Sequence, residues 1–274
     1  MTDRNTRTLD AATVEAAARS LDEAERSRVQ IRQFNLAYPG MTIADAYAIQ
    51  DAWEKIKLAR GRVLKGRKIG LTSKAMQYSV GIDEPDSGTL FDDMFFPEGF
   101  DIPVDRFCEP RIEVELAFIL GKPLAGAGCT IFDVLDATDW VVPSFEIIDS
   151  RLQRVDPETR GTRKIVDTIA DNAADAGVVS GGRPVRPTEV DLRWVSALLY
   201  KNGQIEETGV AAGVLNHPAN GVAWLVNKLA PLGQGLDKGM FVLGGSFTRP
   251  VHGYKGDTFH ADYGPLGQVA FRFV

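Results

Sequence analysis

The chain has 274 residues, of which 44% are apolar and 25% are charged, and its formal net charge at pH 7 is −6. This composition is typical of a globular protein with one large core, and it excludes a disordered chain. The 31 lysines and arginines are dispersed among 37 acids and form no basic block, which argues against a nucleic-acid-binding protein.

Residues 1–7 contain no apolar signal core, and no apolar run reaches the length of a membrane span. We therefore expect a cytoplasmic protein with no membrane partner. The two cysteines, Cys108 and Cys129, are too few for a disulfide framework and lack metal-ligand spacing, which is consistent with a reducing compartment.

Helices are predicted for the amino-terminal part of the chain. Residues 8–28 are rich in Ala, Glu and Arg, and a second helix is expected to begin at Thr42, where Asp45 suggests a capping box. The apolar face of this second helix consists of Ala46, Ile49, Trp53 and Ile56. Two such helices cannot bury a core of their own, so we expect residues 1–62 to pack on a β domain of residues 63–274.

From about residue 63 the pattern changes to short strands separated by Gly and Pro, which predicts a mixed, largely antiparallel β core. Strands are expected at 63–71, 89–96, 110–120, 141–149, 194–200, 204–210, 241–247, 258–263 and 269–274. Further helices are expected at 130–136, 167–176 and 218–229, and loops at 81–88 and 156–163. The sequence Lys201-Asn202-Gly203 predicts a tight type I′ hairpin.

Two of these strands carry acids that suggest a metal site. Glu113 and Glu115 alternate with apolar residues and therefore share one strand face, about 6.5 to 7 Å apart at the backbone. A solvated surface strand is the alternative for such a pair. However, Glu146 lies in the middle of a second apolar run, where a buried carboxylate needs a partner. Three carboxylates offering only oxygen ligands fit Mg²⁺ or Mn²⁺.

Such a metal could chelate a 2-oxo acid and stabilise an enolate, which favours reactions that pass through enols. Lys68 lies on a predicted strand and could move protons or neutralise a substrate carboxylate, although a surface lysine is the alternative. Asp86, between Pro85 and Gly88, could be an acid or base, or it could only form a turn.

Six segments together carry a family resemblance: 68–76 (KIGLTSKAM), 83–86 (DEPD), 111–117 (RIEVELA), 146–149 (EIID), 171–173 (DNA) and 244–249 (GGSFTR). They resemble the hydratase and decarboxylase branch of the fumarylacetoacetate hydrolase superfamily, and the likeness runs from about residue 8 to the C-terminus. The resemblance implies an α+β fold, a mixed β-sandwich roll with N-terminal and peripheral helices. It also implies Mg²⁺ or Mn²⁺ held by Glu113, Glu115 and Glu146, with Lys68 and Asp86 as catalytic residues.

The resemblance implies substrate-binding residues as well, namely Leu71, Arg111, Asn172, Ser246 and Thr248. The implied activity is the metal-dependent addition of water to an unsaturated 2-oxo dicarboxylic acid of aromatic meta-cleavage catabolism, in a homo-oligomeric enzyme. Asp86, aided by Lys68, would transfer the protons. The distal carboxylate of such a substrate needs a cation, for which the candidates are Arg111, Arg151, Arg163 and Arg249.

Several alternatives stay open at this level. Decarboxylation of a 2-oxo-3-enedioate would use the same metal site, hydration of 2-hydroxypenta-2,4-dienoate would differ in the substrate, and a structural subunit of a pathway complex would need no catalysis. A carbon–carbon hydrolase of the superfamily would place a His/Glu pair in the amino-terminal part. That alternative is disfavoured because His217, His252 and His260 all lie far from this part, and a structural role is expected for each.

Overall fold

The computed structural model describes residues 6–80 and 82–274. Residues 1–5, from the segment in which no apolar signal core was found, and Gly81 of the expected 81–88 loop lie outside the described residues. Within the part of the chain that is described, no helix combines the length and the apolar character of a membrane span.

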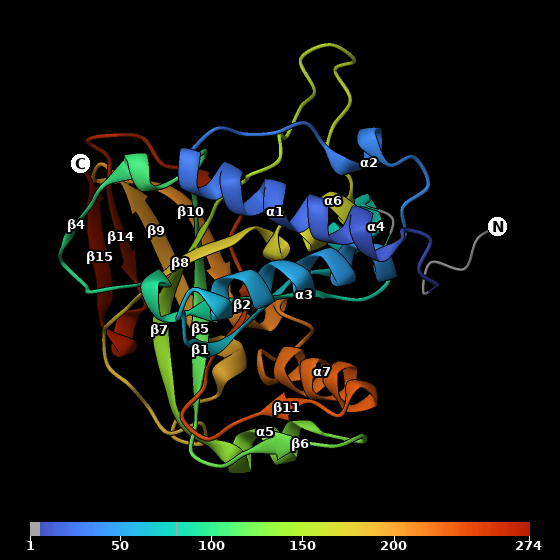
Figure 1. Cartoon of the computed structure of the whole chain (residues 1–274). Coiled ribbons are helices and arrows are strands. Elements are labelled where there is room, and N and C mark those ends of the chain that lie inside the picture. Colours follow the sequence, from blue (N-terminus) through green and yellow to red (C-terminus); the bar gives the residue numbers. More distant parts are fainter. Residues whose placement is uncertain (1–5, 81) are drawn as a thin grey trace.

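A curled sheet of eight strands forms the centre of the molecule (Figure 1). Its order is β2 (Asp86–Phe91), β1 (Leu64–Gly70), β12 (Phe241–Ser246), β5 (Arg111–Leu120), β7 (Thr138–Ile148), β8 (Asp175–Ser180) and β3 (Phe95–Phe96), with β13 (Val251–His252) paired to β5. The β1/β12 and β3/β8 pairs are parallel and the other pairs are antiparallel. The predicted mixed, mainly antiparallel core is therefore confirmed.

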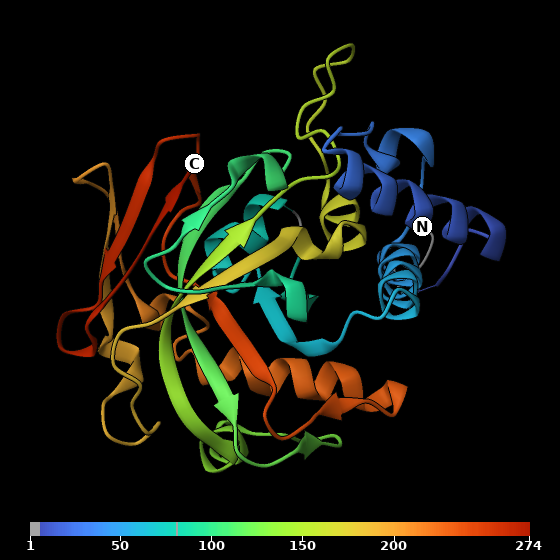
Figure 2. The same cartoon turned by 60° about the vertical axis from the view of Figure 1, so that its left-hand side comes forward.

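A five-stranded sheet packs on one side of the central sheet, and Figure 2 shows it opposite the blue N-terminal helices. Its order is β10 (Gln204–Val210), β9 (Ser196–Lys201), β14 (Thr258–Asp262), β15 (Gln268–Phe273) and β4 (Asp101–Ile102). Asn202 and Gly203 join β9 to β10 with φ angles of 53° and 79°, as the type I′ hairpin prediction requires.

The main apolar core lies between the two sheets and under helix α7 (Ala219–Leu229). The apolar face predicted for β5 is buried there and consists of Ile112, Val114, Leu116, Phe118 and Leu120. Helix α5 (Ile131–Ala137) and a small sheet of β6 (Leu124–Ala125) and β11 (Gly235–Leu236) close the end beside α7. The opposite face of β5 carries Glu113 and Glu115, so the strand separates the core from the acids.

The N-terminal helices form a second apolar cluster with the segment around α6. The helices of this cluster are α1 (Ala11–Ser27), α2 (Phe34–Ala37), α3 (Ile43–Ala59) and α6 (Ile165–Ala170), and a further helix, α4 (Lys74–Val80), follows β1. The capping box of Thr42 and Asp45 is present at the start of α3, and Ala46, Ile49 and Trp53 of the predicted face are buried. Helix α1 begins three residues later than expected because Asp10 caps it through the N–H of Thr13.

Two predictions of local structure were wrong. The helix expected at 167–176 ends at Ala170, because the guanidinium of Arg151 binds both the carboxylate and the carbonyl oxygen of Asp171 (2.6 and 2.7 Å) and the chain then turns into β8. The loop expected at 81–88 ends earlier, because Asp86 already pairs with Gly70 as the first residue of β2. In both places a contact distant in sequence overrides the local pattern.

Candidate active site

Three carboxylates converge on the concave side of β5 and β7. Glu113 lies directly opposite Glu146 in the antiparallel register, and Glu115 follows Glu113 on the same strand face. One oxygen of each carboxylate lies within 4.8 Å of the others. Glu115 and Glu146 are buried and Glu113 is half-buried, so three carboxyl groups share a space with little water.

The donor set fits a divalent metal ion. Both carboxylate oxygens of Glu146 are buried and accept no hydrogen bond from the described residues, although Lys68 Nζ lies 3.1 Å from Glu146 Oε1 as an ion pair. Buried carboxylate oxygens without donors are costly, and a cation would relieve that cost. An all-carboxylate set suits Mg²⁺ or Mn²⁺, which keep open positions for water or substrate.

Gly245 helps to hold Glu115 in place. Its N–H donates a hydrogen bond of 2.8 Å to Glu115 Oε2, and its φ of 118° is a backbone conformation that favours glycine. A Cβ at this position would lie 2.4 Å from Thr72 Oγ1, so no other residue fits without a shift.

The crowded charges change the acidity of the site. Burial, together with the charge of Glu146, raises the pKa of Glu113 to about 8 and that of Glu115 well above its usual range. Burial by itself opposes the charge of Lys68, but Glu146 and Asp86 outweigh it and raise the lysine pKa above its ordinary value. Lys68 is therefore a charged ammonium group beside the carboxylates.

Lys68 and Asp86 come from the neighbouring strands β1 and β2. Lys68 Nζ also donates to the carbonyl oxygen of Ala173 (2.9 Å), which fixes its direction. Asp86 is 1% exposed, and burial raises its pKa to about 6 although Lys68 acts against this shift. A Cβ at Gly70, opposite Asp86, would lie 2.3 Å from Asp86 Oδ1, so this glycine leaves room for the carboxylate.

A strained turn supports Lys68 from the other side. Asn172, Ala173 and Ala174 all have left-handed φ angles (52°, 50° and 66°), which are unfavourable for residues other than glycine. The side chain of Asn172 hydrogen-bonds the backbone N–H and carbonyl of Thr89 on β2 (2.8 and 3.0 Å). These bonds hold the turn so that the Ala173 carbonyl faces Lys68.

Two adjoining cavities open onto these groups. The smaller, of about 390 Å³, is lined by Leu71, Glu113, Glu115, Ser246 and Thr248, among others. The larger, of about 560 Å³, is lined by Lys68, Leu71, Asp86, Arg111 and Glu113, among others. Eight of the ten residues expected in the site thus line one continuous region, since both cavities share Leu71 and Glu113. The other two residues line neither cavity. Glu146 forms an ion pair with Lys68, and Asn172 is hydrogen-bonded to Thr89.

Ser246 and Thr248 fix the segment that leaves β12. Ser246 Oγ donates to the carbonyl oxygen of Thr248 (2.9 Å), and Thr248 Oγ1 accepts the N–H of Val114 on β5 (3.2 Å). Both residues therefore shape the cavity wall next to the carboxylates. Among the described residues, no histidine lines either cavity.

Sequence reasoning missed two polar residues here. Asp175, the first residue of β8, has both carboxylate oxygens buried without a hydrogen-bond donor among the described residues, and burial followed by the charge of Glu146 raises its pKa well above normal. An acid at the start of the apolar run 175–180 was the available signal, but the helix expected through residue 176 hid it. Arg154 lines the larger cavity, as Arg163 does. Apart from its place near a polar loop, nothing in the sequence indicated that Arg154 belongs to the site.

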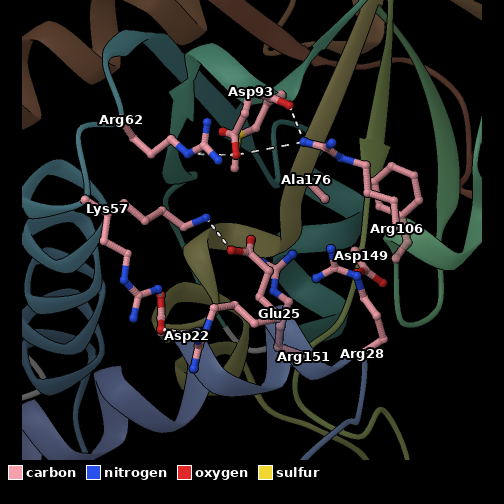
Figure 3. A pocket seen from close by; sticks show the side chains of 14 residues that line it. Asp22, Glu25, Arg28, Lys57, Arg62, Asp93, Arg106, Asp149, Arg151 and Ala176 are labelled. Atoms are coloured by element: carbon pink, nitrogen blue, oxygen red, sulfur yellow. Dashed lines mark hydrogen bonds and ion pairs between the residues drawn. The ribbon is translucent and has the colours of Figure 1, made fainter.

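A separate pocket of about 280 Å³ lies between the N-terminal helices and β8 (Figure 3). Several of its charges form ion pairs, among them Lys57 with Glu25 (2.5 Å), Arg60 with Asp22 (2.5 Å) and Arg62 with Asp93 (3.1 Å). Arg151, one of the arginines considered for the distal carboxylate, lines this pocket and neither of the two cavities at the carboxylates. Its guanidinium is fully buried and bound to Asp171.

Comparison with known proteins places the chain among enzymes of 2-oxo acid metabolism. A 2-oxo-hept-4-ene-1,7-dioate hydratase from Escherichia coli is 62% identical over 274 residues, which cover 100% of each chain. A 2-keto-4-pentenoate hydratase from Paraburkholderia xenovorans (strain LB400) is 38% identical over 259 residues, 94% of each chain. No family model matches the chain.

Solved structures agree with this placement. A 4-oxalocrotonate decarboxylase from Pseudomonas putida G7, complexed with magnesium and adipate, has a TM-score of 0.93 at 36% identity and covers 98% of this chain and 100% of its own. A fumarylpyruvate hydrolase from Pseudomonas aeruginosa, with a TM-score of 0.57 and 16% identity over 78% of this chain and 89% of its own, shares the fold alone. The expected α+β fold is confirmed, and the chain belongs to the hydratase and decarboxylase branch of the fumarylacetoacetate hydrolase superfamily.

Proposed function

We propose that this protein adds water to 2-oxohept-4-ene-1,7-dioate and forms 4-hydroxy-2-oxoheptanedioate in aromatic meta-cleavage catabolism. The observation that carries the proposal is the 62% identity, over the full length of both chains, to the hydratase from Escherichia coli. The convergence of Glu113, Glu115 and Glu146 beside Lys68 supports a catalytic role and speaks against a purely structural subunit.

We assign the metal site to Glu113, Glu115 and Glu146, with Mg²⁺ or Mn²⁺ as the ion. A bound ion would act as a Lewis acid toward a substrate that chelates it through the C1 carboxylate and the C2 oxygen. Support comes from the all-oxygen donor set, the unsatisfied oxygens of Glu146 and the magnesium in the related decarboxylase structure.

Asp86 is the proposed general base and acid. Its ionised carboxylate removes a proton from C3 of the 4-ene substrate, and the resulting carboxylic acid returns a proton to C5, which gives the conjugated 3-ene ketone. Water then adds its hydroxyl group to C4 and a proton to C3, so that the net change is one molecule of water. A pKa of about 6 allows Asp86 to act in both forms near neutral pH. Lys68 assists these proton transfers through its positive charge, and the hydrogen bond to the Ala173 carbonyl oxygen holds its ammonium group in place.

The test follows the ultraviolet absorbance of 2-oxohept-4-ene-1,7-dioate with and without Mg²⁺, while released CO₂ is measured in parallel. Consumption that depends on Mg²⁺ and releases no CO₂ supports the hydratase. Release of CO₂ from a 2-oxo-3-enedioate would favour the decarboxylase. The observation that supports this second candidate is the TM-score of 0.93 to 4-oxalocrotonate decarboxylase. Faster turnover of 2-hydroxypenta-2,4-dienoate would favour the monocarboxylate hydratases.

We also propose that the enzyme works in the cytoplasm as a homo-oligomer. The acidic composition and the absence of a membrane-spanning helix among the described residues are consistent with this location. Sedimentation of the purified protein at several concentrations would test the oligomer.

A further inference from the structure

The lining of the larger cavity carries charges of both signs. Asp86 and Glu113 supply the acids of this lining, together with the cation Lys68. The remaining charged residues of the lining are all cations, namely Arg111, Arg154, Arg163 and Lys164. A small molecule in this cavity could therefore meet the catalytic groups and the arginines at the same time.

The arginines come from two parts of the fold. Arg111 begins β5, two residues before Glu113 and on the same strand face. Arg154 and Arg163 stand at the base of a hairpin loop, where the N–H of Arg163 donates to the carbonyl oxygen of Arg154 (2.9 Å). This loop is the yellow-green excursion at the top of Figures 1 and 2.

The acids around these arginines do not balance them. Glu109 is shared between Arg111 Nη2 (3.3 Å) and Arg154 Nε (3.2 Å). Arg163 donates to Ser150 Oγ (2.6 Å), and its nearest acid, Asp171 at 3.9 Å, is already bound to Arg151.

Arg154 is the least satisfied of the three arginines. Its Nη2 is buried and has no hydrogen-bond partner among the described residues, and its Nε makes only the ion pair with Glu109. Burial, with repulsion from Arg163 and Arg111, lowers the pKa of Arg154 to about 9. A buried cation is costly unless it is paired, so this part of the cavity lining favours an anion.

The spacing fits one class of ligand. An extended chain advances about 3.3 to 3.6 Å for every three bonds, so the five bonds from C2 to C7 of a seven-carbon 2-oxo diacid span roughly 6 Å. Alternate residues on a strand, such as Glu113 and Arg111, are about 6.5 to 7 Å apart at the backbone. A ligand whose 2-oxo group lies near Glu113 would thus place its distal carboxylate near Arg111, which shares Glu109 with Arg154.

We propose that Arg154, flanked by Arg111 and Arg163, binds the distal carboxylate of the substrate and thereby selects 2-oxo dicarboxylates over 2-oxo monocarboxylates. This inference rests on the proposed function, because it assumes that the 2-oxo end lies at Glu113, Glu115 and Glu146. It assigns specificity to the base of the 154–163 loop, and it leaves Arg151 and Arg249 outside the subsite, since neither of them lines the larger cavity.

Binding calorimetry on the Mg²⁺-loaded protein tests the inference with 2-oxoheptanedioate and 2-oxoheptanoate, which differ only in the distal carboxylate. One charge-assisted contact corresponds to a preference of roughly ten- to a hundredfold for the diacid in the wild type. The Arg154→Met variant should lose most of this preference, and Arg154→Lys should keep part of it. Arg160→Met is the matched control, because Arg160 is an exposed residue of the same loop.

Equal affinities of the wild type for the two acids would overturn the inference. Because this comparison needs no variant, the inference stays testable even if Arg154→Met folds poorly. An unchanged preference in a folded Arg154→Met variant would overturn it as well. The two proposals fail separately. A protein that hydrates the heptenedioate but shows no preference contradicts only the subsite, whereas a clear preference without hydration contradicts only the proposed reaction.

Discussion

Glu113 and Glu146 are directly paired across β5 and β7, so two acids occupy opposite positions of one antiparallel ladder. Like charges in such a pair destabilise a sheet. A compensating charge comes from Lys68, whose Nζ lies 3.1 Å from Glu146 Oε1. Glu115 adds a third carboxylate, so one ammonium group cannot balance the cluster, and this imbalance is the physical basis of the predictions about metal.

We expect removal of the metal to abolish activity without unfolding the protein. The apolar clusters do not depend on the carboxylates, whose repulsion in the metal-free protein is relieved by protonation, since burial and the charge of Glu146 raise the pKa of Glu113 and Glu115. Chelator-treated protein should keep its circular dichroism spectrum, lose turnover and recover it with Mg²⁺ or Mn²⁺. Added Mg²⁺ should also raise the melting temperature, because a ligand that binds the folded state stabilises it. Full activity in metal-free protein would falsify the assignment.

Glu146→Gln should weaken metal binding at least about tenfold and reduce turnover, since it removes one negatively charged ligand. The amide keeps the shape of the side chain, so we expect little change in melting temperature. Titration of the metal and a thermal melt on the same preparation separate the two effects. Glu206→Gln, at an exposed position on β10, is the control. If metal affinity stays unchanged while stability falls, Glu146 is a structural acid.

The sequence predicted the parts of the structure that depend on near neighbours. The capping box of Thr42 and Asp45 and the Asn202-Gly203 hairpin each require only a few residues and a preferred φ. The shared face of Glu113 and Glu115 follows from strand alternation alone. None of these features needs knowledge of how distant segments meet.

Contacts between distant segments could not be predicted from such local patterns. The pairing of Glu113 with Glu146 depends on the register of two strands that are joined by a helix, and no local pattern encodes it. Arg151 and Arg154 look equivalent in the sequence. The structure binds Arg151 to Asp171 and directs Arg154 into the cavity, so the partner of each side chain decides its role.

Asp45→Asn should destabilise the amino-terminal helices by about 2 kcal/mol at pH 7. Burial alone would raise the pKa of Asp45, but hydrogen bonds from the N–H groups of Leu9 and Thr42 outweigh it and lower the pKa to about 2. Because the folded pKa is depressed, this stabilisation is complete above about pH 4 and is lost as the pH falls toward 2. Urea unfolding at pH 7 and pH 3 measures it, and the exposed Asp237→Asn is the control. Equal stability of Asp45→Asn and the wild type at pH 7 would contradict the role of Asp45 as a buried cap.

Asp86→Asn should abolish turnover and yet stabilise the protein at pH 7 or above. Burial raises the pKa of Asp86 to about 6 against the opposing charge of Lys68, so the folded state binds the proton more tightly than the unfolded chain does. The contribution of Asp86 to stability is therefore most favourable below about pH 4 and declines as the pH rises through 6. A shift of about two units corresponds to about 3 kcal/mol, which the uncharged amide would recover.

The wild-type rate should follow the opposite course. The ionised carboxylate is the form that accepts the proton from C3, so kcat/KM should rise with pH through about 6 and then level off. Melting curves of both proteins at pH 4 and pH 8 show whether the stability difference appears only at the higher pH. A rate that is flat between pH 5 and 8, together with unchanged stability of Asp86→Asn at pH 8, would assign the proton transfers to another group.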